Sequence, residues 1–600
     1  MARKTLSSSD YQIFLYKVLL WLSFCWSGFI LALAGYFYAS VAWAFFFIGA
    51  FFIFRQAKKK RVSLKPSWEL WVVSIAVLTA AIVFSFFTTP TIFSGRDQGS
   101  ISEAAIRLAQ NHKLTFSTPA SEAFFKLHES GRALNFPGFY YTSQGSLTTQ
   151  FPLVYIVWLA LFYAPLGLNG LIIANAVLFV FFLLSFYLLV RLFTNIGIAA
   201  LGLLFVLTSF GMTWFVKFTL SENMALMLLW ISILTLMLFI YQQRKLHLFL
   251  LFASSALLSF TRIEGFAFFV VLILILALNK DTRKYLSSNS WIYVFLPILF
   301  FAGIFLANAA NDMAFYKELA KALLPTITLP KASYLGQITH MVLPSFYLLR
   351  IFGVYGMLSF FITGTFGLLV LAIRKDLYRL IPFFVVAPTI VYFVNSNISP
   401  DHPWMLRRFI FSLLPGAIFY SLLLIDSWIK KHAESGCGFI LKSTPYLLVI
   451  ILLGMNLPAF TAYATYSENK GLLEQTNALG QQFQPDDLIL VDQKASGDGW
   501  NMITGPMSFV SNRNTVYFFN VQDLNKLDLK PFNTIYLIVP DSNTETYTNS
   551  TFATRLTIRN SYSLSTDRLS VSTNDPNSLL SLPKKKTITV QGKIFTISKQ

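Results

Sequence analysis

Long apolar runs dominate the first three quarters of the chain, as in residues 172–190 and 263–278. A helix that crosses a bilayer needs about 20 mostly apolar residues, and lipid cannot satisfy a bare peptide group, so each run must be helical. Helices of soluble proteins show a polar face, which these runs lack. The pattern predicts an all-α polytopic membrane protein with about thirteen transmembrane helices, at residues 13–34, 36–54, 68–88, 169–191, 197–216, 222–241, 246–261, 263–279, 291–309, 352–373, 378–396, 406–429 and 443–463.

One further apolar segment, residues 151–168, is short and is bracketed by Pro152 and Pro165. Basic residues in short loops collect on the cytoplasmic side of a membrane. If this segment lies in the interface or re-enters, every basic cluster falls on that one side, and we therefore expect it not to cross fully. A true span with a compensating change elsewhere is the alternative. The basic clusters are Arg3 and Lys4, Arg55 to Arg61, Arg191, Arg244 and Lys245, Lys280 to Lys284, Arg374 with Lys375 and Arg379, and Lys430 with Lys431 and Lys442.

This sidedness predicts a multi-pass protein of the plasma membrane with a cytoplasmic N-terminus. Residues 1–67 form a transmembrane hairpin followed by a basic cytoplasmic loop. Residues 68–463 form the helical core, whose first external loop spans residues 89–150. That loop is far longer than an ordinary connection of about 4–6 residues.

The tail, residues 464–600, differs sharply in composition from the rest of the chain and is expected outside the cytoplasm. Alternating segments at residues 488–492 and 535–539 are bounded by Asn, Asp, Gly and Pro, which is typical of strands. A helix is predicted at residues 471–483, ahead of the first strand. The tail is therefore predicted to be a small C-terminal α/β extracytoplasmic domain.

The net charge of +20, with only 12% charged residues, fits this membrane assignment. A strongly basic soluble protein would suggest nucleic acid as a partner. Here the basic residues lie in short clusters between apolar runs, so no nucleic-acid partner is expected. Cys25 lies in the first span and Cys437 in a loop, and their predicted separation excludes a disulfide.

Asp97 is the first candidate for chemistry, because it follows the end of a span and precedes a helix start. A carboxylate there can take a proton from a hydroxyl or help to bind a divalent metal. A solvated turn residue near a helix N-terminus is the alternative. Ser100 and Glu103 fit a capping box, which gives Glu103 a structural explanation and leaves it a secondary candidate.

Three more candidates lie at predicted external span ends. Glu222 begins a span, where the helix dipole also favours an acid, although ionisable groups at membrane depth are often functional. Arg262 and Glu264 interrupt an apolar stretch and either pair with each other or serve a ligand. The planar fork of an arginine is suited to holding a phosphate.

Arg407 and Arg408 lie on the predicted external side, against the usual bias of basic residues, which an anionic external ligand would explain. An interfacial belt anchored by a nearby tryptophan is the alternative. Asp401, His402 and the lone His340 are secondary candidates. The chain contains no zinc-protease, nucleotide-binding or serine-hydrolase motif at a plausible place.

The order of these features resembles the GT-C membrane glycosyltransferases, of the bacterial dolichyl-phosphate-mannose-protein mannosyltransferase and aminoarabinose-transferase type. The resemblance covers roughly residues 68–420, and its motifs are individually degenerate. This sequence differs from the family pattern at Gln98, where the family often has an acid, and in its additional hairpin at residues 13–54. The segments that carry it are Gly95 to Gly99, Ala104 to Ala109, Gln150 to Tyr163, Leu189 to Phe193, Phe218 to Glu222, Leu258 to Gly265 and Arg407 to Pro415.

The resemblance implies inverting transfer of a sugar from a polyprenyl-phosphate carrier to a hydroxyl of a lipid, glycan or protein on the external face. Asp97 would be the base with Glu222 beside it, and both would be the ligands if a divalent metal takes part. Arg262 and Arg407, with Arg408 as a further candidate, would contact the carrier phosphate. No nucleotide cofactor is expected. The alternatives are a transporter or lipid flippase, or a membrane scaffold that presents the C-terminal domain.

Overall fold

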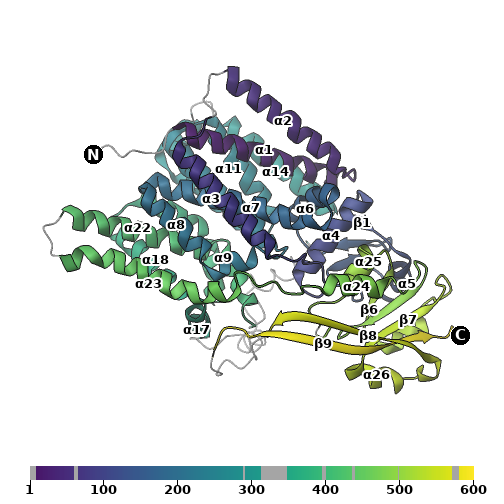
Figure 1. Cartoon of the computed structure of the whole chain (residues 1–600). Coiled ribbons are helices and arrows are strands. Elements are labelled where there is room, and N and C mark those ends of the chain that lie inside the picture. The colour runs from purple at the N-terminus through teal and green to yellow at the C-terminus, as the bar shows by residue number, and fades with distance from the viewer. Residues whose placement is uncertain are drawn as a thin grey trace, which may run out of the picture.

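The computed structural model describes residues 8–59, 65–287, 291–311, 316, 347–394, 401–434, 439–497, 499–570 and 580–599. It consists of a helical bundle, a first-loop segment and a C-terminal domain (Figure 1). The first-loop segment lies between the bundle and the C-terminal sheet. We call the end of the bundle that carries the C-terminal domain the domain end.

The bundle contains the long apolar helices predicted from the sequence. Its helices are α1 (Ser8–Leu33), α2 (Ala39–Lys59), α3 (Trp68–Phe86), α6 (Leu153–Leu166), α7 (Leu168–Phe193), α8 (Ile196–Leu207), α9 (Phe210–Phe215), α10 (Ser221–Gln242), α11 (Lys245–Ser259), α12 (Glu264–Leu278), α13 (Lys280–Ser287), α14 (Ile292–Asn311), α17 (Tyr347–Val354), α18 (Met357–Ile373), α19 (Leu377–Val386), α20 (Val391–Val394), α21 (Arg407–Ile410), α22 (Leu413–Glu434) and α23 (Phe439–Tyr463).

All thirteen predicted spans fall on helices, and the polytopic helical fold is confirmed. Within the described residues, eight helices are long and apolar enough to cross a membrane, or up to ten if each of two bent pairs is one span. The predicted number of thirteen is not reached, because α8, α11 and the α19–α20 segment are apolar but short. Helix α10 lies at the centre of the bundle, whereas α2 and α14 turn exposed Phe and Ile side chains outward.

Helix α6 occupies the segment whose crossing was uncertain. It has 14 residues, and at about 1.5 Å per residue it is shorter than a hydrocarbon core of about 30 Å. Its side chains from Leu153 to Phe162 are all buried. That length and burial agree with the prediction that residues 151–168 do not cross fully, which stays a prediction.

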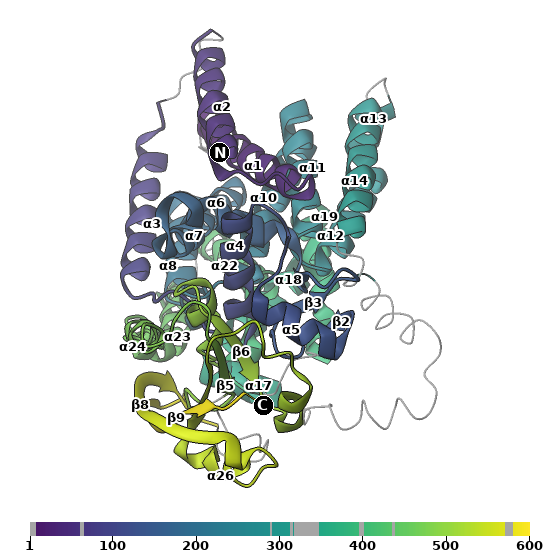
Figure 2. The same cartoon turned by 90° about the vertical axis from the view of Figure 1, so that its right-hand side faces the viewer.

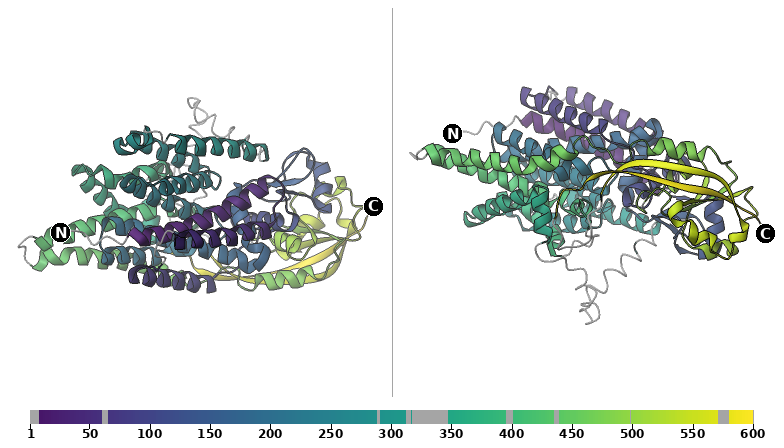
Figure 3. Two further views of the ribbon diagram at one scale, coloured as in Figure 1. Left: turned by 90° about the horizontal axis from the view of Figure 1, so that it is seen from above. Right: turned by 60° about the horizontal axis from the view of Figure 1, so that its bottom comes forward.

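The basic clusters near the ends of α2, α13, α22 and α23 lie away from the domain end. Figure 2 shows the C-terminal end of α2 and the short basic helix α13 at the end of the bundle opposite the C-terminal sheet. The left panel of Figure 3, seen from above, shows the green helices α22 and α23 extending to the left, away from the C-terminus. This arrangement is the one that the positive-inside rule requires if the C-terminal domain lies outside the cytoplasm.

The first loop folds into two helices and a small sheet. Helices α4 (Asp97–Asn111) and α5 (Pro119–His128) accompany β1 (Thr115–Phe116), β2 (Gly131–Arg132), β3 (Phe139–Tyr141) and β4 (Leu147–Thr149). The strands pair antiparallel in the order β1-β4-β3-β2. The sequence did not predict this sheet, because strands of two or three residues are too short to show alternation.

The C-terminal domain confirms the predicted α/β architecture. Its sheet has the order β6-β5-β7-β9-β8, in which β5 pairs in parallel with β6 and β7, and β9 pairs antiparallel with β7 and β8. Strands β5 and β7 are the two predicted from the sequence. The elements are α24 (Leu472–Gly480), β5 (Leu488–Asp492), α25 (Thr504–Phe509), β6 (Asn514–Phe518), β7 (Ile535–Pro540), α26 (Thr544–Thr548), β8 (Leu556–Leu569) and β9 (Lys585–Ile597).

Lys217 joins the bundle to the C-terminal domain. Its ammonium donates to the carbonyl oxygens of Tyr463, Ala464 and Tyr466, at 3.1, 2.6 and 2.9 Å, just where α23 ends. Burial lowers the pKa of Lys217 to about 8. A cation at a helix C-terminus satisfies carbonyls that have no helical partner, so this contact fixes the point at which the chain enters the domain.

We predict that the C-terminal domain lies outside the cytoplasm. A reporter enzyme that works only outside the cytoplasm should be active when it is fused after Tyr463 and inactive when it is fused after Lys431 near the end of α22. The reason is the shared sidedness of the basic clusters. Cytoplasmic location of the Tyr463 fusion would overturn this orientation.

Candidate active site

Six charged side chains meet at the domain end of the bundle. Their positions follow from the ends of helices, because Asp97 begins α4, Glu222 lies in the first turn of α10 and Glu264 begins α12. The three arginines are Arg262, in the turn between α11 and α12, and Arg407 and Arg408, which begin α21. We call these six residues the charged cluster.

Arg407 bridges the two acids that the sequence singled out. Its Nη1 lies 2.6 Å from Oδ2 of Asp97, and its Nε lies 3.7 Å from Oε1 of Glu222. The structure thus brings Asp97 and Glu222 to one place, as the sequence predicted. They approach each other through the guanidinium of Arg407.

Arg262 holds the buried side of the cluster. Its two terminal nitrogens lie 2.9 Å from Glu222 and 2.9 Å from Glu264, and Nη1 also donates to the hydroxyl of Ser221 at 3.0 Å. Its guanidinium lies 5.1 Å from the centre of the Phe411 ring. The expected pairing of Arg262 with Glu264 is present, and both ends of the fork are engaged by carboxylates.

Arg408 completes the cluster on its more open side. Its Nη1 lies 3.3 Å from Glu264, which also accepts a hydrogen bond from the hydroxyl of Tyr392. Within the described part of the chain, the Nε atoms of Arg408 and of Arg262 are buried without a hydrogen-bond partner. An unsatisfied buried donor is costly, so these two atoms mark the places where the cluster has capacity for a further acceptor.

The cluster is balanced in charge but uneven in exposure. Three guanidinium groups face three carboxylates. The side chain of Glu222 is 2% exposed, whereas that of Asp97 is 41% exposed. Arg408 is 24% exposed. A ligand that arrives from the open side therefore meets Asp97 and Arg408 first, and Arg407 lies in contact with Asp97.

The arginines set the protonation state of Asp97. Burial raises the pKa of its carboxyl group, but the positive charges of Arg407, Arg408 and Arg262 outweigh that effect and hold the pKa below its ordinary value. Asp97 is therefore ionised throughout the physiological pH range.

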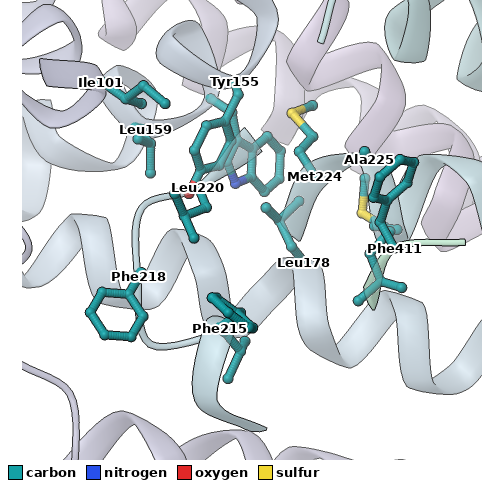
Figure 4. Close-up of a cluster of buried hydrophobic side chains, with 14 of the residues drawn as sticks. Ile101, Tyr155, Leu159, Leu178, Phe215, Phe218, Leu220, Met224, Ala225 and Phe411 are labelled. Atoms are coloured by element: carbon teal, nitrogen blue, oxygen red, sulfur yellow. The ribbon is translucent and has the colours of Figure 1, made fainter. Parts of the chain in front are cut away.

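Figure 4 shows a cluster of buried apolar side chains that includes Phe411, the ring in contact with Arg262. Phe411, whose ring faces Arg262, lies beside Ala225 of α10. Tyr155 donates to Asn175 at 2.6 Å, and Asn175 in turn donates to the carbonyl oxygen of Phe218 at 2.9 Å. The labelled members of this apolar cluster are Ile101, Tyr155, Leu159, Leu178, Phe215, Phe218, Leu220, Met224, Ala225 and Phe411.

The predicted capping box at Ser100 and Glu103 is wrong, because α4 begins three residues earlier, at Asp97. Its N-cap is Arg96, which makes no side-chain capping bond. Ser100 donates instead to the carbonyl oxygen of Pro137 at 2.9 Å. Glu103 contacts Arg107 at 4.0 Å and Ser94 at 3.4 Å, so its partners lie outside the charged cluster.

The remaining secondary candidates lie next to the cluster or outside the described residues. Asp401 pairs with Arg96 at 2.8 Å, and His402 shares a hydrogen bond of 2.9 Å with the hydroxyl of Tyr355. Both are buried. His340 falls outside the described residues. Arg96 was missed as a candidate because its partner is distant in the sequence.

A divalent metal does not fit the charged cluster. Among the described residues, no group of three or more His, Cys, Asp or Glu side chains is placed to hold a metal ion. The proposed ligands Asp97 and Glu222 both face Arg407, and a guanidinium repels a cation.

The fold is similar to that of known proteins, although the sequence is not. No protein-family model matches the chain, and no curated protein matches it in sequence. Its structure is similar to ArnT from Cupriavidus metallidurans in the apo state, with a TM-score of 0.51 and 12% identity over 87% of this chain and 97% of that one. It is also similar to the oligosaccharyltransferase of Archaeoglobus fulgidus in a complex with Zn and sulfate, with a TM-score of 0.50 and 13% identity. This second match covers 78% of this chain and 69% of that one.

Both of these proteins are members of the GT-C superfamily. The GT-C-like fold predicted from the order of the sequence motifs is therefore confirmed. At these identities, the likeness concerns the fold.

We predict that Glu222→Gln destabilises the protein, because it leaves Arg262 buried with one carboxylate fewer. Removing one partner of a buried ion pair typically costs about 3–5 kcal/mol. The measurement is the melting temperature of purified protein in detergent. As a control, Asp528→Asn removes the exposed contact with Lys126 and should leave the melting temperature unchanged. Equal melting temperatures for the two variants would contradict this assignment.

Proposed function

We propose that this protein is a glycosyltransferase that moves a sugar from a polyprenyl-phosphate carrier to a hydroxyl of a lipid, glycan or protein acceptor. The observation that carries the proposal is the charged cluster, which combines an open-sided pair of arginines with an ionised carboxylate at the domain end of a GT-C fold. Lipid-linked donors place their phosphate at such a membrane boundary. No nucleotide is needed in this chemistry.

The carrier phosphate is proposed to bind Arg407 and Arg408. When the glycosidic bond breaks, negative charge grows on the departing phosphate, and guanidinium groups fixed in place stabilise it most as it forms. Among the residues that the structure describes, Arg408 has one carboxylate contact and an Nε without a hydrogen-bond partner. Arg262 is engaged at both ends by Glu222 and Glu264, so we assign it to holding the cluster together, with direct phosphate contact as the alternative.

Asp97 is proposed to act as the base. It is the most exposed acid of the cluster, and its partner Arg407 is the arginine that the phosphate would engage. Binding of the phosphate would draw Arg407 away and free a carboxylate oxygen for the acceptor hydroxyl. The hydroxyl oxygen then attacks the anomeric carbon opposite the phosphate, its proton passes to Asp97, and the configuration inverts.

The alternatives explain less of the structure. A transporter usually has charged groups near mid-membrane and a repeated architecture, whereas this cluster lies at helix ends on one side of the bundle. A scaffold that only presents the C-terminal domain would not require six balanced charges, one of which is 41% exposed.

We predict that Asp97→Asn lowers the rate of carrier-dependent transfer by about 100- to 10,000-fold, the usual contribution of a general base. The amide keeps the shape and loses the charge. The assay follows labelled sugar from polyprenyl phosphate to acceptor with purified protein, and binding of the carrier should persist because Arg407 and Arg408 remain.

The matched control for this variant is Asp376→Asn. Asp376 is also a partly exposed carboxylate paired with an arginine, Arg379 at 3.4 Å, but it lies in the turn between α18 and α19. The control should transfer sugar at the rate of the unmodified protein. Near-normal turnover by Asp97→Asn would refute the role of Asp97 and return attention to Glu222.

A further inference from the structure

Arg96, the residue before the proposed base, is held by three parts of the chain at once. Its Nη2 donates to Asp401 at 2.8 Å. Its guanidinium lies 4.6 Å from the centre of the Trp404 ring and 4.5 Å from the centre of the Trp500 ring. Asp401 and Trp404 belong to the segment that leads into α21, whereas Trp500 belongs to the C-terminal domain.

The backbone beside Arg96 is also fitted to the C-terminal domain. The amide of Met502 donates to the carbonyl oxygen of Ser94 at 2.7 Å. Gly95 has φ +110°, and a Cβ there would lie 2.6 Å from the carbonyl oxygen of Gly499. Only glycine tolerates both this dihedral angle and this approach, so residues 94–96 and 499–502 lie in direct contact.

This arrangement connects the two segments that carry the proposed chemistry. Arg96 is the N-cap of α4 and makes no capping bond, so the direction in which Asp97 leaves the loop depends on what holds Arg96. Asp401 and Trp404 lie just before Arg407 in the chain. The guanidinium of Arg96 therefore links the Asp97 segment to the Arg407 segment, and the indole of Trp500 packs against the same guanidinium.

We propose that Trp500 is a positioning residue for the transfer reaction, which it supports by clamping Arg96 and so fixing Asp97 relative to Arg407. The proposal rests on the proposed function. None of the six residues of the charged cluster belongs to the C-terminal domain, so Trp500 acts on the chemistry through Arg96. A cation–aromatic contact is stronger when water is excluded, and the side chain of Arg96, which contacts both indole rings, is only 14% exposed.

The first test compares substitutions at Trp500 in the full-length protein. Trp500→Ala should lower kcat about tenfold and leave the KM for the polyprenyl-phosphate sugar unchanged, because Arg407 and Arg408 stay in place. Trp500→Tyr should recover most of the rate, since it restores an aromatic face. The control is Phe519→Ala in the same domain, at a side chain that is 44% exposed, as Trp500 is. Normal kcat in Trp500→Ala, or no recovery by tyrosine, would overturn the proposal.

A double-mutant cycle separates positioning from general stability. If Trp500 acts through Arg96, adding Trp500→Ala to Arg96→Ala should cause no further loss of kcat. Independent, multiplying losses would show that Trp500 acts elsewhere and would overturn the proposal.

The clamp is testable even if the protein transfers no sugar, an outcome that would refute the proposed function alone. Hydrogen exchange of the amides in the first turns of α4 then tests whether Trp500 holds the start of this helix in place. Exchange should be faster in Trp500→Ala than in the unmodified protein and unchanged in Phe519→Ala. Unchanged exchange in Trp500→Ala would overturn the clamp itself.

Discussion

The need to neutralise three arginines at the boundary between bundle and C-terminal domain governs the rest of this structure. A partly buried guanidinium loses hydration and is tolerated only when carboxylates replace the water. Glu222 and Glu264 supply that compensation to Arg262, and Asp97 supplies it to Arg407. Each of these acids lies at the start of a helix, where the dipole favours a negative charge, so the same helix ends that organise the bundle also organise the cluster.

The neutralisation of charge differs between the two sides of the cluster, because the side chain of Arg262 is 7% exposed whereas that of Asp97 is 41% exposed. Arg262 is tied to two acids, to Ser221 and to the ring of Phe411, so moving it would break several contacts together. Asp97 and Arg407 make a closer but more exposed pair. In the proposed function, an incoming phosphate that engages Arg407 would replace one anion by another, so the pair would open without leaving an unpaired charge.

Much of this site could be predicted from the sequence because its residues break the apolar pattern. Arg262 and Glu264 interrupt an apolar stretch, and Glu222 lies where a predicted span begins. Arg407 lies on the predicted external side, against the usual distribution of basic residues. These signals are local. They identify which residues are unusual and on which side of the bundle they are expected, and the shared sidedness then implies that they meet.

The parts that were missed depend on contacts between distant segments. The capping box was predicted from a four-residue pattern, but α4 begins at Asp97. The residues just before it contact distant segments, since Gly95 packs against the C-terminal domain. Arg96 meets Asp401 across 305 positions. Neither that separation nor the approach of Trp500 leaves a periodic trace in the sequence.

The small sheet of the first loop was missed for a different reason. Its strands of two or three residues are set by their pairing with one another, and so short a strand carries no alternation of its own.

The most direct measurement of the central claim is the choice of sugar donor by the purified full-length protein in lipid vesicles. A panel of labelled polyprenyl-phosphate sugars is supplied, one sugar at a time, beside the corresponding nucleotide sugars, and free polyprenyl phosphate is quantified. The account predicts that a polyprenyl-phosphate sugar is consumed with release of polyprenyl phosphate, and that no nucleotide sugar is used. Consumption of a nucleotide sugar, or no release of polyprenyl phosphate from any donor of the panel, would contradict it.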